Sequence, residues 1–398
     1  MNSRCTPPPR GFPEAEFAGR LERAQEHMAA LSMDAMLLTT DVDIRYFSGF
    51  LTQFFQSPTR TWFLVVPKAG KPVAVIPTIG AVAMSRTWIE DIRTWSSPHA
   101  TDDGVSLLAQ TLSEAGGRIG LPRIGIPMGR ESALRMPLND FARLRQQVDG
   151  TDFIDASPLI RALRLVKSER EIDKIAHACA SVGDAFDAAP DLFSIGQSDV
   201  EAFRAFKIAC LKQGVDDVSY LVGGAGPGGY GDIISPPTGR AIAHGDVLVL
   251  DTGCTYDGYF CDFDRNFAFG AADDPARRAY DTVYCATEAG LAAARPGASC
   301  ADLYKAMQSV LGVMQAEGDV GRLGHGLGMQ LTEGPSNTPW DETELRPGMV
   351  MTLEPSLAFG AGKVMVHEEN IVIRDGEPQL LSRRAPPELP VLGSCSVT

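Results

Sequence analysis

The segment at 251–270, DTGCTYDGYFCDFDRNFAFG, concentrates carboxylates directly after a buried-type apolar run. The Asp257-Gly258 pair between two apolar runs predicts a β-hairpin. A turn centred just before Asp257 places Asp251 opposite Asp262, and a turn centred just after it places Asp251 opposite Asp264. Either register puts these three carboxylates on one face, where they would repel one another unless a cation lay among them.

Two glutamates form a second candidate acidic pair. Strand-like runs at 349–357 and 363–373 flank a Gly-Ala-Gly loop. If that loop centres on Ala361, Glu354 lies opposite Glu368 on one face of a β-hairpin. Both runs are apolar enough to be buried, and a buried carboxylate needs a partner or a metal ion.

His325 stands in the glycine-rich stretch GHGLG, whose neighbours have no side chains to obstruct a close approach of the imidazole. Two aspartates, one histidine and two glutamates would form an oxygen-rich site with a single imidazole. Such ligands suit Mn²⁺, Fe²⁺, Co²⁺ or Zn²⁺. If two such divalent metal ions lay close together, they would polarise a carbonyl and activate a water molecule.

The order of these residues, with their surroundings, resembles the M24 or pita-bread metallopeptidase family, which includes aminopeptidase P, prolidase, methionine aminopeptidase and the metal-free creatinase. The matching motifs are LDTGCTYDGYFCDFDR, GHGLG, RPGMVMTLEP and HEENIVI. The resemblance spans roughly residues 158–385. It implies an α+β pita-bread catalytic domain with a pseudo-twofold repeat at 158–398, after a smaller α/β domain of the creatinase/prolidase N-terminal type at 1–157.

The resemblance also implies roles for the five residues. Asp251 would bind one ion, Asp262 and Glu368 would bridge both ions, and His325 and Glu354 would complete the other site. The water between the ions would attack an amide carbonyl while Glu354 takes its proton. The implied reaction is hydrolysis of an Xaa-Pro-type bond in a dipeptide-like substrate, by an enzyme that forms a homodimer.

The substrate-handling residues of the family are not all kept. Thr332 stands where family peptidases carry a second histidine, and a further family histidine falls in the stretch that here begins at Asp232. Val366 replaces an arginine of several prolidase-like members, and Asp264 replaces a usual threonine. By position, the candidates for substrate binding or catalysis are Tyr230, Asp232, Thr332 and Asp264.

These losses leave two other functions open. One is a creatinase-like amidinohydrolase or lyase that acts on a small osmolyte-type or nitrogen-rich metabolite. The other is a non-catalytic binding scaffold, although relatives of that kind have typically lost the ligands that this sequence retains.

The amino-acid composition limits the classes of partner and the compartment that we expect for this protein. The chain has 398 residues and a formal net charge of −14, which argues against nucleic acid or an anionic membrane as a partner. It contains no apolar run that approaches a membrane span of about eighteen residues, and its start has no apolar signal region. Eight scattered cysteines without a CxxC motif suit a reducing compartment, so we expect a cytoplasmic protein.

The elements that must position these residues can be outlined from periodicity. Strand-like runs alternating with helical patterns predict an α/β domain before residue 157. Ser168 and Glu171 form a capping box that predicts the start of a long helix. Two helices followed by two strand regions then occur twice, which indicates an internally duplicated domain. The glycine-rich stretch 224–229 fits GxGxxG but opens no helix, so we expect a loop there and no dinucleotide site.

Overall fold

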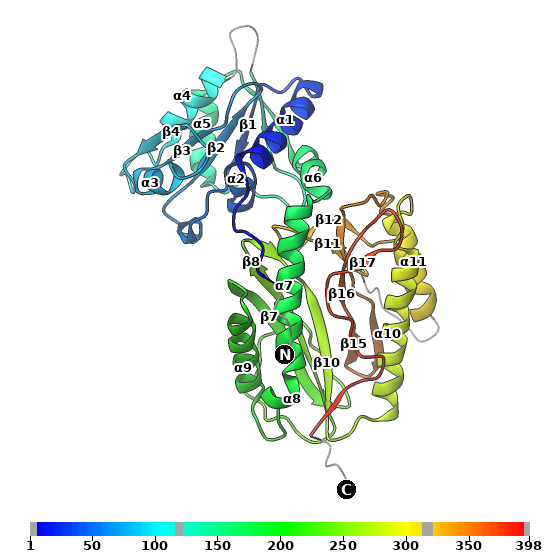
Figure 1. The fold of residues 1–398 in the computed structure, drawn as a ribbon. Helices are drawn as coiled ribbons and strands as arrows, with labels where there is room; N and C mark the ends of the chain where they lie inside the picture. The colour runs from blue at the N-terminus through cyan, green and yellow to red at the C-terminus, as the bar shows by residue number, and fades with distance from the viewer. Residues whose placement is uncertain (1–5, 116–121, 313–320, 394–398) are drawn as a thin grey trace. The chain divides into compact units, whose positions relative to one another are not determined.

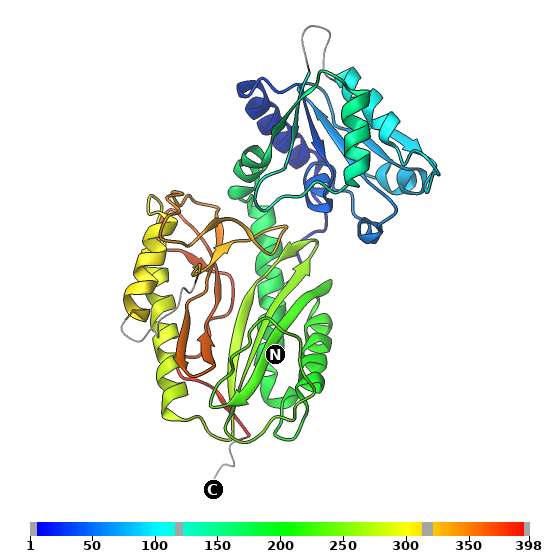
Figure 2. The same cartoon turned by 180° about the vertical axis from the view of Figure 1, so that it is seen from behind.

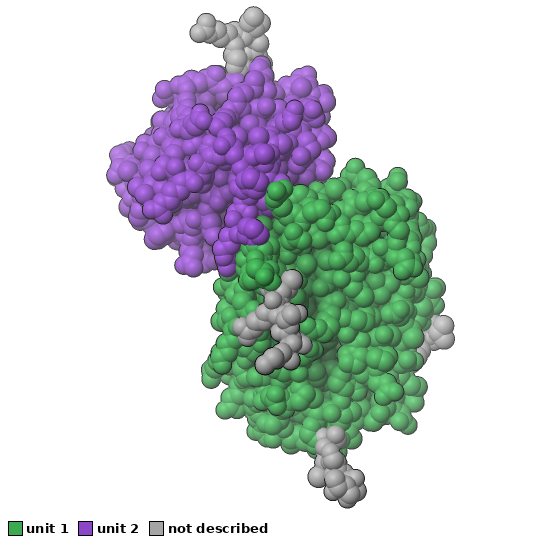
Figure 3. Space-filling view, in the orientation of Figure 1, with its two compact units in different colours: residues 1–8, 165–398 green, residues 9–164 purple. Residues whose placement is uncertain are grey.

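The computed structural model describes residues 6–115, 122–312 and 321–393. They form two compact units, which Figure 3 shows in different colours: Pro9–Arg164, and Met1–Pro8 together with Leu165–Thr398. The sequence places a domain boundary after residue 157. The residue at which one domain ends and the next begins stays a prediction.

The unit at 9–164 is built on a six-stranded mixed sheet. In sheet order its strands are β4 (Asp91–Trp95), β3 (Val73–Pro77), β2 (Phe63–Pro67), β1 (Ala35–Leu38), β5 (Arg123–Ile126) and β6 (Asp152–Asp155). Its helices are α1 (Glu14–Ala30), α2 (Asp41–Ser48), α3 (Ala81–Met84), α4 (Val105–Ala115), α5 (Leu138–Gln147) and α6 (Ser157–Leu165). The predicted α/β order is confirmed. The edge strands β4 and β6 carry exposed polar residues and so lack the apolar signal of the central strands.

The larger unit contains two sheets and a separate hairpin, flanked by pairs of helices (Figure 1). Its helices are α7 (Glu169–Asp187), α8 (Ala189–Leu192), α9 (Asp199–Gln213), α10 (Asp274–Ala293) and α11 (Cys300–Leu311). The first sheet has the order β18 (Val391–Leu392), β10 (Phe263–Phe269), β8 (Asp246–Tyr256) and β7 (Asp217–Pro227), with β9 (Tyr259–Phe260) paired to β8. The second has the order β12 (Glu333–Ser336), β11 (His325–Gly326), β13 (Val350–Leu353), β16 (Glu369–Val372) and β17 (Gln379–Leu380). The hairpin consists of β14 (Ser356–Gly360) and β15 (Lys363–Val366).

The duplicated order of elements predicted from the sequence is confirmed. Helices α7 and α9 pack on the sheet of β7 and β8, and α10 packs on β13, β14 and β15. Seen from behind, the long strands β7, β8 and β10 lie side by side (Figure 2). The α7 helix begins at the predicted capping box, in which the Ser168 side chain accepts from the Glu171 N–H while the Glu171 side chain accepts from the Ser168 N–H.

An apolar core joins the helices of the second repeat to both sheets. Its members are buried aliphatic and methionine side chains from α10, α11, β8 and β13. They include Val283, Leu303, Met307, Val249, Met351 and Leu353. Burial of these side chains determines which face of each strand points to the core and so fixes the pairing register. A strand that slipped by one residue would turn its apolar face to water.

The β8–β9 hairpin turns at Asp257 and Gly258, whose φ angles of 47° and 74° suit the tight turns of two-residue hairpins. In the resulting register Asp264 pairs with Asp251. The second of the two predicted registers is therefore the correct one. Asp262 lies just before β10, two residues from Asp264.

The glutamates lie in a gap between two ladders. Leu353 pairs with Glu369 on one side of the gap, and Ser356 pairs with Val366 on the other. Both ladders share one register, which sets Glu354 against Glu368 as the sequence predicts. Each long run is interrupted at its glutamate, so that two predicted strands become four.

The predicted loop at 224–229 is wrong over most of its length. Strand β7 continues to Pro227, which pairs with Asp246. Within this stretch Gly226 permits a close approach, because a Cβ added there would lie 2.4 Å from the carbonyl oxygen of Gly229.

Candidate metal centre

Three of the expected ligands converge in the described structure. Asp262, His325 and Glu368 each offer an atom within 4.8 Å of the others, and all three side chains are buried. His325 Nε2 lies 3.3 Å from Asp262 Oδ2. On the other side of the ring, Nδ1 lies 2.9 Å from the carbonyl oxygen of Gly326, which fits a proton on Nδ1 and leaves Nε2 as the atom that faces Asp262.

Asp251 joins this cluster through a tyrosine that the sequence analysis missed. The Tyr220 hydroxyl lies 2.9 Å from Asp251 Oδ1 and also contacts Asp262 Oδ1. Burial, followed by the negative charge of Asp262, raises the pKa of Tyr220 well above its ordinary value, so the hydroxyl keeps its proton and can donate. The Tyr220 ring fits there because Gly253 has no side chain: a Cβ added at Gly253 would lie 2.3 Å from Tyr220 Cε1.

The position of Tyr220 depends on an irregularity in β7. The register between β7 and β8 shifts between Val218 and Tyr220. Such a bulge re-aims the side chains that follow it and leaves no mark in the alternation of residue types. The small residue at Gly253 is the sequence signal that could have pointed to a bulky neighbour.

Three of the carboxylates, those of Asp251, Glu354 and Glu368, are mostly buried next to other acidic groups, which disfavours their charged forms. Burial, followed by the charge of Asp262, raises the pKa of Asp251 and of Glu368 well above their ordinary values. Burial likewise raises the pKa of Glu354 to about 7. Among the described residues, Glu368 Oε1 is buried and has no hydrogen-bond partner. A buried carboxylate oxygen without a partner, among like charges, fits a divalent cation that neutralises the group.

Asp264 lies behind Glu368. Its Oδ1 accepts a hydrogen bond of 2.7 Å from the Glu368 N–H, and its Oδ2 accepts one of 3.3 Å from Asn266 Nδ2. Burial raises the pKa of Asp264 to about 7. With both oxygens hydrogen-bonded to the protein, Asp264 positions the backbone of Glu368. Its part in catalysis stays a prediction.

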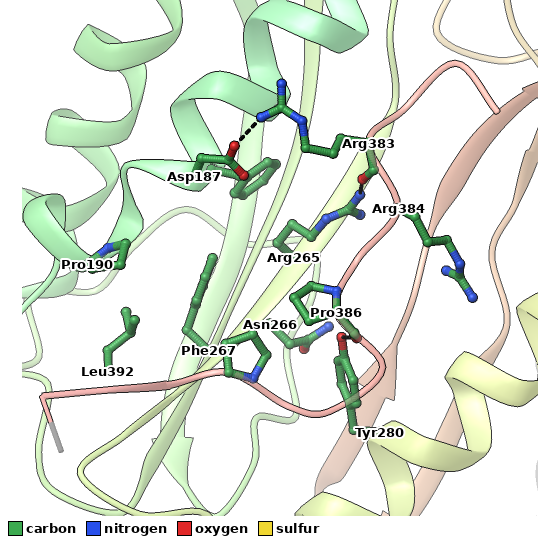
Figure 4. Close-up of a pocket in the computed structure, with 13 residues that line it drawn as sticks. Asp187, Pro190, Arg265, Asn266, Phe267, Tyr280, Arg383, Arg384, Pro386 and Leu392 are labelled. Carbon is green, nitrogen blue, oxygen red and sulfur yellow. Dashed lines mark hydrogen bonds and ion pairs between the residues drawn. The ribbon is translucent and has the colours of Figure 1, made fainter. Parts of the chain in front are cut away.

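Arg265 supports the same strands from the opposite face of β10. It donates to the carbonyl oxygens of Asp264 (2.6 Å) and Glu368 (3.1 Å) and forms a 3.1 Å ion pair with Glu369. Figure 4 shows Arg265 beside the C-terminal segment that carries Arg383, at a cavity of about 220 Å³. A buried guanidinium thus fixes the backbone of one expected ligand, Glu368, and of its neighbour Asp264.

Asn370 performs a similar task for Asp262. Its Oδ1 accepts a 2.9 Å hydrogen bond from the Asp262 N–H, and its Nδ2 donates to the Asp262 carbonyl oxygen. The residue lies in the HEENIVI motif, but only the packing of β16 against the hairpin shows which backbone it holds.

The candidates for substrate contact lie in different surroundings. Tyr230 is buried and its hydroxyl donates a 2.6 Å hydrogen bond to Asn266 Oδ1, in the layer behind Asp264. Asp232 is exposed and accepts hydrogen bonds from the N–H groups of Ile234 and Ser235 within its own turn. Thr332 accepts a 3.2 Å hydrogen bond from Arg322.

A buried cluster of carboxylates and one imidazole, held between duplicated helix-and-sheet layers, defines the class of metal-dependent hydrolases with the pita-bread fold. Residues 173–375 match the family model for metallopeptidase family M24, and residues 20–166 match the creatinase/prolidase N-terminal domain. The chain belongs to metallopeptidase family M24. The resemblance and the fold class predicted from the sequence are confirmed, and family membership implies an enzyme with divalent metal ions as cofactors.

Relatives match along nearly the whole chain. The probable dipeptidase PepE of Mycobacterium tuberculosis is 27% identical over 389 residues, which cover 96% of this chain and 98% of the relative. The crystal structure of dipeptidase PepE from Mycobacterium ulcerans has a TM-score of 0.83 at 26% identity and covers 96% of this chain and 99% of that one. A prolidase from Thermococcus sibiricus shares the fold, with a TM-score of 0.83 at 23% identity over 94% of this chain and 99% of that one.

None of the helices in the described residues has the length and hydrophobicity needed to cross a membrane.

Proposed function

We propose that this enzyme is a dipeptidase that hydrolyses small Xaa-Pro-type substrates with two divalent metal ions. The observation that carries the proposal is the convergence of Asp262, His325 and Glu368, with Glu368 Oε1 left without a partner among the described residues. The names of relatives support the substrate class, since one at 28% identity over 64% of this chain is an Xaa-Pro dipeptidase of Pyrococcus horikoshii.

Five side chains would hold the ions: Asp251, Asp262, His325, Glu354 and Glu368. Bound there, the ions would polarise the scissile carbonyl and lower the pKa of a water molecule. The identity of the metal follows from availability as much as from the ligands, and Mn, Fe, Co and Zn all suit a site of four carboxylates and one imidazole.

The side chains of this enzyme supply the proton transfers and the orientation. Glu354 would take the proton of the attacking water, the role that the resemblance implies for it. Tyr220 orients Asp251 and Asp262, while Asp264 and Asn370 hold the backbone of Glu368 and Asp262. The geometry of the ligands is therefore set by neighbours that do not themselves need to bind metal.

A second candidate function is favoured by the residues at positions 232 and 332. The resemblance implies histidines that contact substrate or carry protons at the position of Thr332 and within the stretch that begins at Asp232. A creatinase-like amidinohydrolase or a lyase would use the same scaffold on a small nitrogen-rich metabolite.

The test is an activity panel on metal-loaded protein. Xaa-Pro dipeptides, dipeptides without proline, and small amidino and lactam compounds are incubated with Mn-, Co- or Zn-loaded enzyme, and the products are quantified by chromatography. Cleavage of the dipeptides that Asp262→Asn abolishes supports the proposal. Asp281→Asn, which changes an exposed aspartate on α10, is the matched control. Full metal occupancy without any peptide cleavage, together with turnover of an amidino or lactam compound, would favour the second candidate.

A further inference from the structure

The cavity of about 220 Å³ in Figure 4 lies between α7, β10 and the C-terminal segment. Much of its wall is apolar, because the buried side chains of Phe186, Phe267 and Leu392 line it. The Tyr280 hydroxyl fixes the C-terminal segment there through a 2.7 Å hydrogen bond to the carbonyl oxygen of Pro386. None of the lining residues is an expected metal ligand, so the cavity is separate from the metal centre.

Arg265 offers one unused hydrogen-bond donor to this cavity. A guanidinium has five N–H groups. The four on Nη1 and Nη2 donate to protein atoms, which are the carbonyl oxygens of Asp264, Glu368 and Arg383 and the carboxylate of Glu369. The fifth, on Nε, has no partner among the described residues and is not completely enclosed by protein, although Arg265 is only 8% exposed. A mostly buried donor without a partner is costly, which favours a ligand oxygen at this position.

The rim of the cavity carries an excess of negative charge. Arg383 forms a 2.6 Å ion pair with Asp184 and a second ion pair with Asp187, which lies three residues further along α7 (Figure 4). Two carboxylates therefore share one guanidinium, and the side chain of Asp187 is 59% exposed. Arg384 does not offset this charge, because it points away from the cavity and pairs with carboxylates elsewhere. The rim thus suits a cationic group of a ligand.

We infer that this cavity binds a free amino acid with an apolar side chain, at a site separate from the metal centre. The apolar side chain would lie against Phe267 and Leu392, the carboxylate would accept from Nε of Arg265, and the ammonium group would pair with Asp187. The charges favour a zwitterion over a simple anion, because Glu369 already neutralises Arg265 and the rim is negative. The inference stands on these contacts and not on the reaction proposed above.

The first test compares ligands that differ in one charged group. L-leucine, L-valine, 4-methylpentanoate and L-leucinamide are titrated into the metal-loaded full-length protein by isothermal calorimetry. Of these, 4-methylpentanoate is leucine without its amino group, and leucinamide is leucine without its carboxylate. Each analogue should bind about tenfold or more weakly than L-leucine, the effect expected for loss of a hydrogen bond to a charged group. Failure of both amino acids to bind, or equal affinity for L-leucine and either analogue, would overturn the inference.

The second test places the ligand in the cavity. Leu392→Trp fills the cavity from its apolar side and should weaken L-leucine binding by about tenfold or more. Asp187→Asn removes the rim charge, so the variant should bind L-leucine and 4-methylpentanoate equally. Glu169→Gln, at an exposed glutamate of the same helix that pairs with Arg374, is the matched control and should bind as the wild type does.

Binding that survives Leu392→Trp would lie outside the cavity, for example at the metal centre, and would overturn the inference. The melting temperature and metal content of each variant show whether the fold is kept. If Leu392→Trp does not fold, Asp187→Asn decides alone, and an unchanged preference for L-leucine over 4-methylpentanoate overturns the inference. Because each readout is binding, the result is independent of whether the enzyme cleaves dipeptides.

Discussion

The N–H of Glu368 donates a 2.7 Å hydrogen bond to Oδ1 of Asp264, so one acidic residue fixes the backbone of another. The two residues are 104 positions apart in the chain. The bond connects the end of the β14–β15 hairpin to β10. It fixes the backbone of a glutamate whose side-chain Oε1 has no hydrogen-bond partner among the described residues.

This bond can be tested by Asp264→Ala. The change leaves the buried Glu368 N–H without an acceptor, which should lower the free energy of unfolding by about 1–3 kcal/mol. Metal affinity should fall as well, because Glu368 loses its fixed orientation. Urea denaturation and metal titration measure the two effects. Unchanged metal affinity in a destabilised variant would restrict Asp264 to a structural role.

Asp262→Ala should remove both metal ions together. The resemblance assigns Asp262 to a bridging position, and the structure places it in contact with both His325 and Tyr220. Metal per subunit after gentle purification, measured by inductively coupled plasma mass spectrometry, should fall from near two in the wild type to near zero. Full metal content in the variant would exclude this assignment.

Tyr220→Phe keeps the ring that packs against Gly253 and removes only the hydroxyl. Loss of hydrogen bonds to Asp251 and Asp262 should weaken metal binding by roughly tenfold, the effect typical of groups that orient metal ligands. Competition with a fluorescent chelator measures the affinity. The same substitution at Tyr304, which lies on α11, provides a control. An affinity equal to that of the wild type would show that the carboxylates are oriented by other contacts.

Metal removal should destabilise the enzyme more at pH 8 than at pH 6. Burial raises the pKa of Glu354 and of Asp264 to about 7, so in the metal-free protein their stability contribution is present at low pH and lost as the pH rises through 7. A cation offsets the charges that appear there. The gain in melting temperature on adding Mn²⁺ to protein treated with a chelator should therefore be larger at pH 8, and an equal gain at both pH values would contradict this account.

His367 should make the folded protein acid-sensitive. It is buried, lies 2.9 Å from Thr287 Oγ1, and burial lowers its pKa to about 3. Since the unfolded chain binds a proton near pH 6.5, stability should fall below that pH by up to about 1.4 kcal/mol per pH unit. Urea denaturation at pH 7 and pH 5.5 should show a smaller loss for His367→Gln than for the wild type. Equal losses would mean that His367 stays partly charged in the fold.

The amino-acid sequence by itself determined the order and local setting of the five expected ligands. The Asp257-Gly258 turn and the apolar runs on each side limit the hairpin to two registers, and both place Asp251, Asp262 and Asp264 on one face. The Gly-Ala-Gly loop sets Glu354 against Glu368 in the same way. These relationships depend on turn chemistry and on the two-residue period of a strand, which are local and therefore readable from the sequence.

Only the tertiary structure decided which neighbours hold those ligands. Tyr220 reaches Asp251 because of a bulge, and Asn370 reaches the backbone of Asp262 across 108 positions. Tyr230 and Asp232, which are close together in sequence, lie in a buried layer and in an exposed turn. Residue type and spacing do not encode such contacts, because they arise when sheets and helices pack, and packing depends on side chains that are distant in the chain.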